Sequence, residues 1–295
     1  MSTKASENRS CVSSHCYFLI FSETFFLSKL CRSLSATIRL AWLQRYPFNS
    51  AILKMRFTLL EADHEDAADF LKIIECQWRS YEEPLQSFFR MFCPLRGEGP
   101  SARIDSLKES ASRQLDWHKS DPTSFWAKVV DDKGQIAGAC LWKVYRKNPF
   151  ETPDDHSDVY WYPEGESRDY VSKCLEQFDA PRRKMAARPH VYLNIIFTHP
   201  DYRRKGVADL MLAWGKQKAD ELGVEMWLDA TKYGVPVYKK HGFIVVNENR
   251  VQPTKKDPGE AWKKIDQELQ PIEFWQMWRP VGGEYDEGRT VKPWV

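Results

Sequence analysis

The strongest fold signal in this chain is an apolar run that passes through a short basic turn into an amphipathic helix. Residues 191–198 read VYLNIIFT, which the β-branched and aromatic content predicts to be a buried strand. Residues 199–206 read HPDYRRKG, and residues 207–222 carry apolar side chains at helical spacing. A strand followed directly by a turn and a helix favours an α/β fold.

The turn has the composition of an anion-binding loop. Residues 203–208 fit the pattern [RQ]-x-x-G-x-[GA], which aims successive backbone N–H groups at one point. Gly206 lets the backbone approach a ligand without an intervening Cβ, and the following helix adds its positive N-terminal dipole. The pattern is neither a P-loop nor a three-glycine dinucleotide loop. It indicates a pyrophosphate site, although a basic turn before a helix can also be solvated surface.

With its neighbours, this turn resembles the GNAT superfamily of acetyl-CoA-dependent N-acetyltransferases. Residues 193–215 are similar to the family's CoA-binding strand, loop and helix, and residues 228–243 (LDATKYGVPVYKKHGF) to its second half. Residues 162–166 and 189–190 resemble an insertion in many fungal members. The resemblance implies an α/β GNAT fold, with a mixed, mostly antiparallel twisted sheet of about six or seven strands flanked by helices.

The resemblance implies acetyl-CoA as cosubstrate and no metal. In the family, the main chain of the strand before the loop binds the pantetheine arm, and a backbone N–H there polarises the thioester carbonyl. These strand residues can equally be core residues, because the contacts are main-chain. The implied cofactor contacts are Ile196, Phe197, Thr198, Arg203, Arg204, Lys205, Gly206, Val207, Ala208 and Thr231.

Tyr238 matches the tyrosine that protonates the departing CoA thiolate in many members, and a packing role is the alternative. No general base is evident. Asn194 stands where some members carry an acid, and an amide cannot accept the proton. His190 and His156 are the first two candidates, with surface or loop-capping roles as the alternative reading. The remaining candidates are Asp154, Asp155 and His199.

The composition divides the chain into three parts. Residues 1–54 hold seven Lys and Arg against two Asp and Glu, and none of the 14 glycines. We interpret them as a disordered leader, a mitochondrial transit peptide or a gene-model extension; a secretion signal is a further alternative. Residues 55–280 are expected to form the GNAT domain, with an aromatic insertion over 145–190, and residues 281–295 to form a tail.

The near balance of 43 Lys and Arg against 41 Asp and Glu argues against nucleic acid as a partner. No integral membrane segment is expected, and seven cysteines without paired spacing favour a reducing, cytoplasmic compartment or, with a real transit peptide, the mitochondrion. The sequence does not determine the oligomeric state.

The sequence thus predicts an N-acetyltransferase acting on an amine of a small molecule or peptide by direct attack in a ternary complex. The alternatives are a non-catalytic CoA-binding or regulatory module on the same fold, and an acyltransferase with another donor or acceptor. The aromatic residues of 145–170 are expected to line the acceptor pocket and to favour an apolar or aromatic amine.

Overall fold

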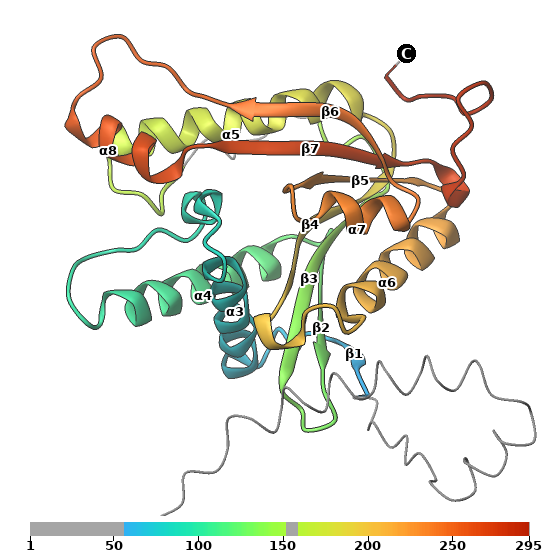
Figure 1. Ribbon diagram of the computed structural model, residues 1–295, viewed down its shortest axis with the longest axis horizontal. Helices are drawn as coiled ribbons and strands as arrows, with labels where there is room; N and C mark the ends of the chain where they lie inside the picture. The colour runs from blue at the N-terminus through green and yellow to red at the C-terminus, as the bar shows by residue number, and fades with distance from the viewer. Residues whose placement is uncertain (1–55, 152–158, 295) are drawn as a thin grey trace, which may run out of the picture. The chain divides into compact units, whose positions relative to one another are not determined.

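The computed structural model describes residues 56–151 and 159–294 (Figure 1). The leader over 1–54 and the candidate bases Asp154, Asp155 and His156 lie outside these residues. The strands are β1 (Thr58–Glu61), β2 (Ser124–Val130), β3 (Ile136–Tyr145), β4 (His190–Thr198), β5 (Glu225–Ala230), β6 (Ile244–Val251) and β7 (Ile272–Arg279). The α-helices are α3 (Ala67–Glu82), α4 (Ala102–Ser120), α5 (Glu166–Met185), α6 (Val207–Leu222), α7 (Val235–Lys240) and α8 (Glu260–Leu269). Short 3₁₀ turns are η1 (Ser87–Met91), η2 (Pro200–Tyr202) and η3 (Val281–Gly283).

The described strands form one seven-stranded sheet in the order β1-β2-β3-β4-β5-β7-β6. Only β4 and β5 run parallel, and every other pair in the sheet is antiparallel. This arrangement confirms the predicted α/β fold with a mixed, mostly antiparallel sheet. The parallel pair is joined by the crossover helix α6, as a parallel connection requires.

Strands β4 and β5 separate part-way along their length. They pair only from His190 to Leu193, whereas β4 continues to Thr198 on its other edge, against β3. A bulge in the β3–β4 ladder places Asn194 between two registered pairs, without a partner of its own. Beyond the bulge, the β4 edge that faces β5 is therefore free of sheet hydrogen bonds.

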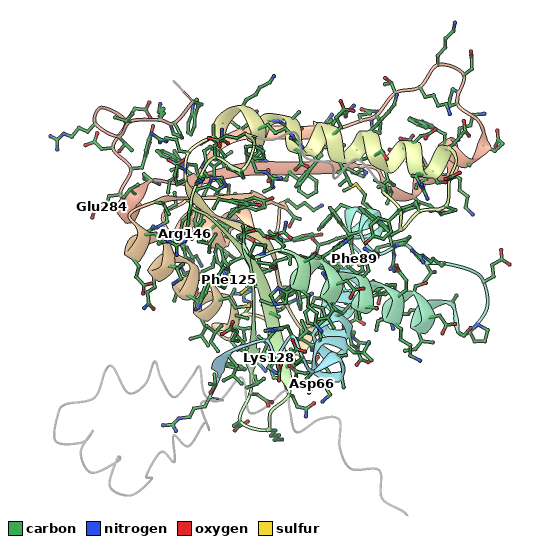
Figure 2. All side chains as sticks on the ribbon, turned by 180° about the vertical axis from the view of Figure 1, so that it is seen from behind. Asp66, Phe89, Phe125, Lys128, Arg146 and Glu284 are labelled. Carbon is green, nitrogen blue, oxygen red and sulfur yellow. The ribbon has the colours of Figure 1, made fainter. Side chains whose placement is uncertain are left out.

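Helices cover both faces of the sheet. Helices α3, α4, α5 and α8 pack on one face, and α6 and α7 pack on the other (Figure 1). Phe125 on β2 lies toward α6, where its ring is 6.1 Å from that of Trp214 (Figure 2). Gly215 brings α6 close to the sheet, because a Cβ there would lie 2.3 Å from the ring of Trp142.

The segment predicted as a tail packs back onto the sheet over its described residues. The ring of Trp294 lies 5.6 Å from that of Trp227 on β5 and 5.2 Å from that of Trp278 on β7. Both of these partners are fully buried. Among the described helices, none has the length and apolar character needed to cross a bilayer.

Candidate active site

A cavity of about 980 Å³ opens where β4 and β5 separate. One part is lined by the free edge of β4 and by α7, and the other by aromatic side chains from η1, α4, α5 and β7. The predicted site residues that line it are Asn194, Ile196, Phe197, Thr198, Arg203, Ala208, Thr231 and Tyr238. The fold therefore brings the separated strand, part of the basic turn and the tyrosine to one cavity.

The basic turn has the backbone of an anion-binding loop. Arg204 (φ 60°) and Gly206 (φ 87°) both adopt left-handed conformations directly before α6 begins at Val207. Alternation of right- and left-handed residues turns successive N–H groups toward one side, and the first N–H groups of α6 have no intrahelical partner. Arg204 and Lys205 are exposed beside them. The turn thus presents backbone donors and positive charge together.

Side chains around the turn hold it in place. Arg203 Nη2 donates to the carbonyl oxygen of Ser80 in the last turn of α3, at 2.9 Å. The hydroxyl of Tyr202 donates to Asp131 Oδ2, at 2.8 Å, on the β2–β3 hairpin. The guanidinium of Arg203 is therefore engaged with α3, so its predicted cofactor role reduces mainly to positioning the turn and lining the cavity.

The free edge of β4 is approached by a tyrosine that the sequence did not reveal. Tyr81 on α3 lines the cavity, and its hydroxyl donates to the carbonyl oxygen of Ile196 at 3.0 Å. Burial raises the pKa of Tyr81, so it remains a donor at neutral pH. The Phe197 side chain packs in the core with Tyr81 while its main chain faces the cavity. The strand can thus pack in the core through its side chains and still bind a cofactor through its main chain.

Tyr238 is buried on α7, and it reaches the same cavity from the opposite face of the sheet. Its ring packs edge-on against Phe243, with 6.0 Å between the ring centroids. Burial raises the pKa of Tyr238, so the phenol is protonated at neutral pH, as a proton donor must be. Thr231 lines the cavity just before α7.

The two described histidine candidates for the base do not line the cavity. His190 is fully buried; its Nδ1–H donates to the carbonyl oxygen of Arg188 at 2.7 Å, and burial lowers its pKa to about 4. His199 instead caps η2 by accepting from the backbone N–H of Asp201. The proposal of His190 as base is therefore corrected: its side chain sits in the protein interior, out of reach of a bound amine.

An aromatic wall forms the outer part of the cavity. Tyr160 and Trp161 of the insertion line it, together with Trp117 of α4. The indole N–H of Trp117 donates to the Tyr160 hydroxyl at 2.7 Å, and that of Trp161 to the Met91 carbonyl at 2.8 Å. Tyr162 does not line the cavity; it is buried beside the wall.

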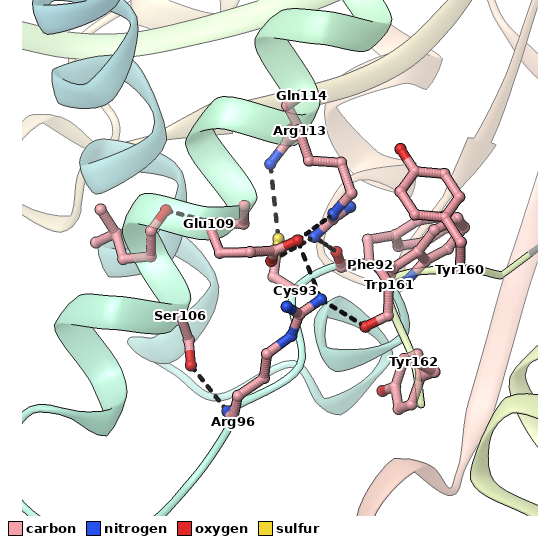
Figure 3. A network of polar contacts seen from close by, with 12 residues as sticks. Phe92, Cys93, Arg96, Ser106, Glu109, Arg113, Gln114, Tyr160, Trp161 and Tyr162 are labelled. Carbon is pink, nitrogen blue, oxygen red and sulfur yellow. Dashed lines mark hydrogen bonds and ion pairs between the residues drawn. The ribbon is translucent and has the colours of Figure 1, made fainter. Parts of the chain in front are cut away.

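Two arginines from outside the insertion hold this wall in place (Figure 3). The Arg113 guanidinium lies 4.7 Å from the Trp117 ring centroid and 5.2 Å from that of Trp161. Glu109 pairs with Arg113 at 2.8 Å and with Arg96 at 3.0 Å, and Arg96 also donates to the Trp161 carbonyl at 2.6 Å. The insertion is thereby fixed to α4 by a charged network.

A polar cluster, formed by Asp179, Arg182, Tyr192 and Asp229, also lines the cavity; Tyr192 is buried, and the other three are partly buried. The Arg182 guanidinium lies 4.2 Å from the Tyr192 ring centroid and forms an ion pair with Asp179. The Tyr192 hydroxyl donates to Asp229 Oδ2 at 3.0 Å. None of these four is a predicted site residue, because their proximity arises from the pairing of β4 with β5 and the packing of α5.

The sequence profile of the acetyltransferase (GNAT) family matches residues 85–243, which is more than half of the chain. The chain belongs to the GNAT acetyltransferase family. Membership supports an acyltransferase that takes an acetyl group from acetyl-CoA, and the family acts on amine acceptors. No curated protein is significantly similar to the chain in sequence.

Solved structures with the same fold include two mosquito proteins. Arylalkylamine N-acetyltransferase 2 from Aedes aegypti is 16% identical, with a TM-score of 0.51, over 77% of this chain and 99% of that one. Mosquito arylalkylamine N-acetyltransferase like 5b is 14% identical, with a TM-score of 0.52, over 77% of this chain and 100% of that one. At such identities the likeness shows the fold alone.

Proposed function

We propose that this protein is an acetyl-CoA-dependent N-acetyltransferase that acetylates an amine of a small molecule or peptide by direct attack in a ternary complex. The observation that supports the proposal is that the free edge of β4, the two ends of the anion-binding turn (Arg203 and Ala208) and Tyr238 line one cavity. Aromatic side chains line the same cavity, and we assign them to the acceptor.

The residues present fit acetyl-CoA. The left-handed Arg204 and Gly206 direct N–H donors toward one point, which suits a pyrophosphate. From Ile196 to Thr198 the β4 edge carries main-chain groups that β5 does not use, which suits the amide-bearing pantetheine arm. Bound there, the thioester supplies an activated acetyl group, and an N–H of this edge would polarise its carbonyl.

Chemistry in this site depends mainly on positioning and proton transfer. Holding the amine and the thioester in one cavity makes their reaction effectively unimolecular, which lowers its entropic cost. Tyr238 would donate its proton to the departing thiolate, since the phenol is protonated and lines the cavity. The acceptor nitrogen must lose protons for the reaction to proceed, which requires a proton acceptor in the same cavity.

The aromatic wall favours an apolar or aromatic amine as acceptor. Beyond Trp117 and Trp161, the rings of Phe88, Phe178 and Phe274 line the same space. Aromatic rings bury large apolar areas and stack on flat ligands, so an amine with an aromatic or apolar body would gain most from this surface.

We place this activity in a reducing compartment such as the cytoplasm. The described cysteines, Cys76, Cys93, Cys140 and Cys174, are all free and buried. Burial raises the pKa of each thiol to about 12, so none is a reactive thiolate. A mitochondrial location stays open if residues 1–54 act as a transit peptide.

The test combines binding with turnover. Purified protein is heated with and without millimolar acetyl-CoA or CoA, and then incubated with acetyl-CoA and a panel of aromatic, aliphatic and peptide amines. We expect a raised melting temperature and an N-acetylated product by mass spectrometry. Absence of stabilisation by either cofactor would overturn the proposal. Binding without turnover of any amine would favour the non-catalytic module, and transfer only to hydroxyl groups or from another acyl-CoA would favour the other alternative.

A further inference from the structure

The proposed reaction lacks a proton acceptor among the sequence candidates that the structure describes. We therefore considered the carboxylates and imidazoles that line the cavity, which are His118, Asp121, Asp179 and Asp229.

Three of the four are engaged elsewhere. Although burial alone would raise it, the pKa of Asp121 is held below its usual range by Lys143 and Thr123, so it is a weak base. Asp179 forms the closer of the two ion pairs of Arg182, the other being with Asp229 at 3.5 Å, and it lies on α5 and not on the separating strands. His118 shares a 2.9 Å hydrogen bond with Ser124 on β2, two strands away from β4, which corresponds to roughly 10 Å.

Asp229 stands at the point of separation. Leu228 is the last residue of β5 that pairs with β4, so Asp229 is the first residue beyond the paired region. Its side chain is 3% exposed, yet it lines the cavity between the two diverging strands. It is therefore the cavity carboxylate held on the same pair of strands that forms the proposed thioester site.

One carboxylate oxygen of Asp229 is held by Tyr192 and Arg182, and the other is buried opposite Gln276 on β7. Oδ2 accepts from the Tyr192 hydroxyl at 3.0 Å and lies 3.5 Å from Arg182 Nη1. Among the described residues, Oδ1 has no hydrogen-bond partner, and neither has the Nε2 of Gln276, which is opposite Asp229 on β7. Gln276 favours the ionised carboxylate and is the protein donor beside Oδ1, so a donor that enters from the cavity would compete with Gln276 for this oxygen.

Groups from each neighbouring element act on the charge of Asp229. Burial raises its pKa, which moves this carboxylate toward the range of a useful base. Arg182 of α5, Tyr192 of β4 and Gln276 of β7 lower the pKa, and Asp179 of α5 raises it. The cluster carries a net charge of −1 when both aspartates are ionised, because Arg182 balances one of them.

We propose that Asp229 is the general base that takes a proton from the amine substrate. This inference rests on the proposed function. Oδ1 binds the ammonium form and takes one proton, which frees the nitrogen lone pair to form the C–N bond with the acetyl carbonyl carbon. The C–S bond breaks and the sulfur takes the proton of Tyr238. The nitrogen then loses a second proton to the Tyr238 oxygen, and Asp229 releases the proton that it took to solvent. The net products are therefore the amide, CoA and one proton.

The test is the pH profile of kcat/KM for one productive amine, so that titration of the amine is the same for every variant. Asp229→Asn is expected to lower kcat by about 10²- to 10⁴-fold and to keep acetyl-CoA binding. Tyr192→Phe removes a hydrogen bond that favours the ionised carboxylate and should move the acid limb to higher pH. Asp179→Asn removes a neighbouring negative charge and should move the acid limb to lower pH.

These opposite shifts keep the inference testable even if Asp229→Asn fails to fold, since a merely structural role would not produce them. His118→Gln is the matched control and is expected to leave the acid limb in place. The inference is wrong if the acid limb of the kcat/KM profile shifts in His118→Gln, or if it stays in place in both Tyr192→Phe and Asp179→Asn. The acetyltransferase assignment would stand in either case. If the wild-type protein acetylates no amine, the proposed function itself fails and the role of Asp229 fails with it.

Discussion

Gly234 packs directly against the ring of Tyr238, one helical turn further along α7. A Cβ at Gly234 would lie 2.6 Å from Cε2 of that ring, closer than real Cβ contacts. Gly234 has an ordinary right-handed backbone (φ −81°), so its conformation does not require glycine. The absence of a side chain at this position is what leaves room for the tyrosine.

We expect Gly234→Ala to displace the Tyr238 ring and to lower kcat by about tenfold or more, because proton donation depends on position. The KM for acetyl-CoA should change little. Steady-state kinetics on a productive amine measures both. Gly288→Ala is the control, because its Cβ would lie 3.6 Å from the nearest atom, an ordinary contact. Equal losses in the two variants would contradict the positioning role.

The turn before α6 should be sensitive to a side chain at Gly206. This residue has φ 87°, so Gly206→Ala imposes backbone strain of about 1–2 kcal/mol although only Asp209 is near the new Cβ. We expect the Kd for CoA to rise about tenfold while the acceptor KM is kept. Gly223→Ala, at the other end of α6 with φ 65°, carries similar strain and should leave CoA binding intact by calorimetry. Equal weakening in both would show a general loss of stability.

The aromatic wall should affect the acceptor and not the donor. Trp161→Leu removes a cavity-lining ring and is expected to raise the acceptor KM about tenfold, with the KM for acetyl-CoA nearly constant. Tyr162→Phe is the control: it removes only a hydroxyl that donates to the Arg90 carbonyl outside the cavity. A Trp161 variant that raises both KM values equally would place the acceptor elsewhere.

His190 should make the free energy of unfolding depend on pH. Its folded-state pKa of about 4 lies below the unfolded value near 6.5, so the unfolded chain binds more protons between these values. The free energy of unfolding should therefore fall as the pH drops from about 6.5 to about 4, by about 3 kcal/mol from this residue alone. Urea titrations across this range should show a flatter dependence for His190→Gln than for the wild type. The exposed His64, replaced by Gln, serves as the control.

The positions of the acid–base candidates could not be predicted from the sequence alone. Alternation along β4 does not by itself tell which face each side chain occupies, because the bulge at Asn194 shifts the register against β3. His190 and Tyr192 precede the bulge and share one face of β4, where His190 is fully buried and Tyr192 meets Asp229 of β5. Helix α5 continues through Pro181 and so carries Arg182 to the cavity, although a proline usually ends or kinks a helix.

The sequence by itself determined the fold class, the family and the segments that we propose bind the acetyl donor. These depend on backbone conformation within contiguous segments: a strand, the left-handed turn at Gly206 and the short helix with Tyr238. Only the tertiary structure revealed the other polar residues of the cavity, where Tyr81, Arg182 and Asp229 come from α3, α5 and β5. Their proximity depends on helix packing and on strand pairing between residues far apart in the chain, which local side-chain patterns do not specify.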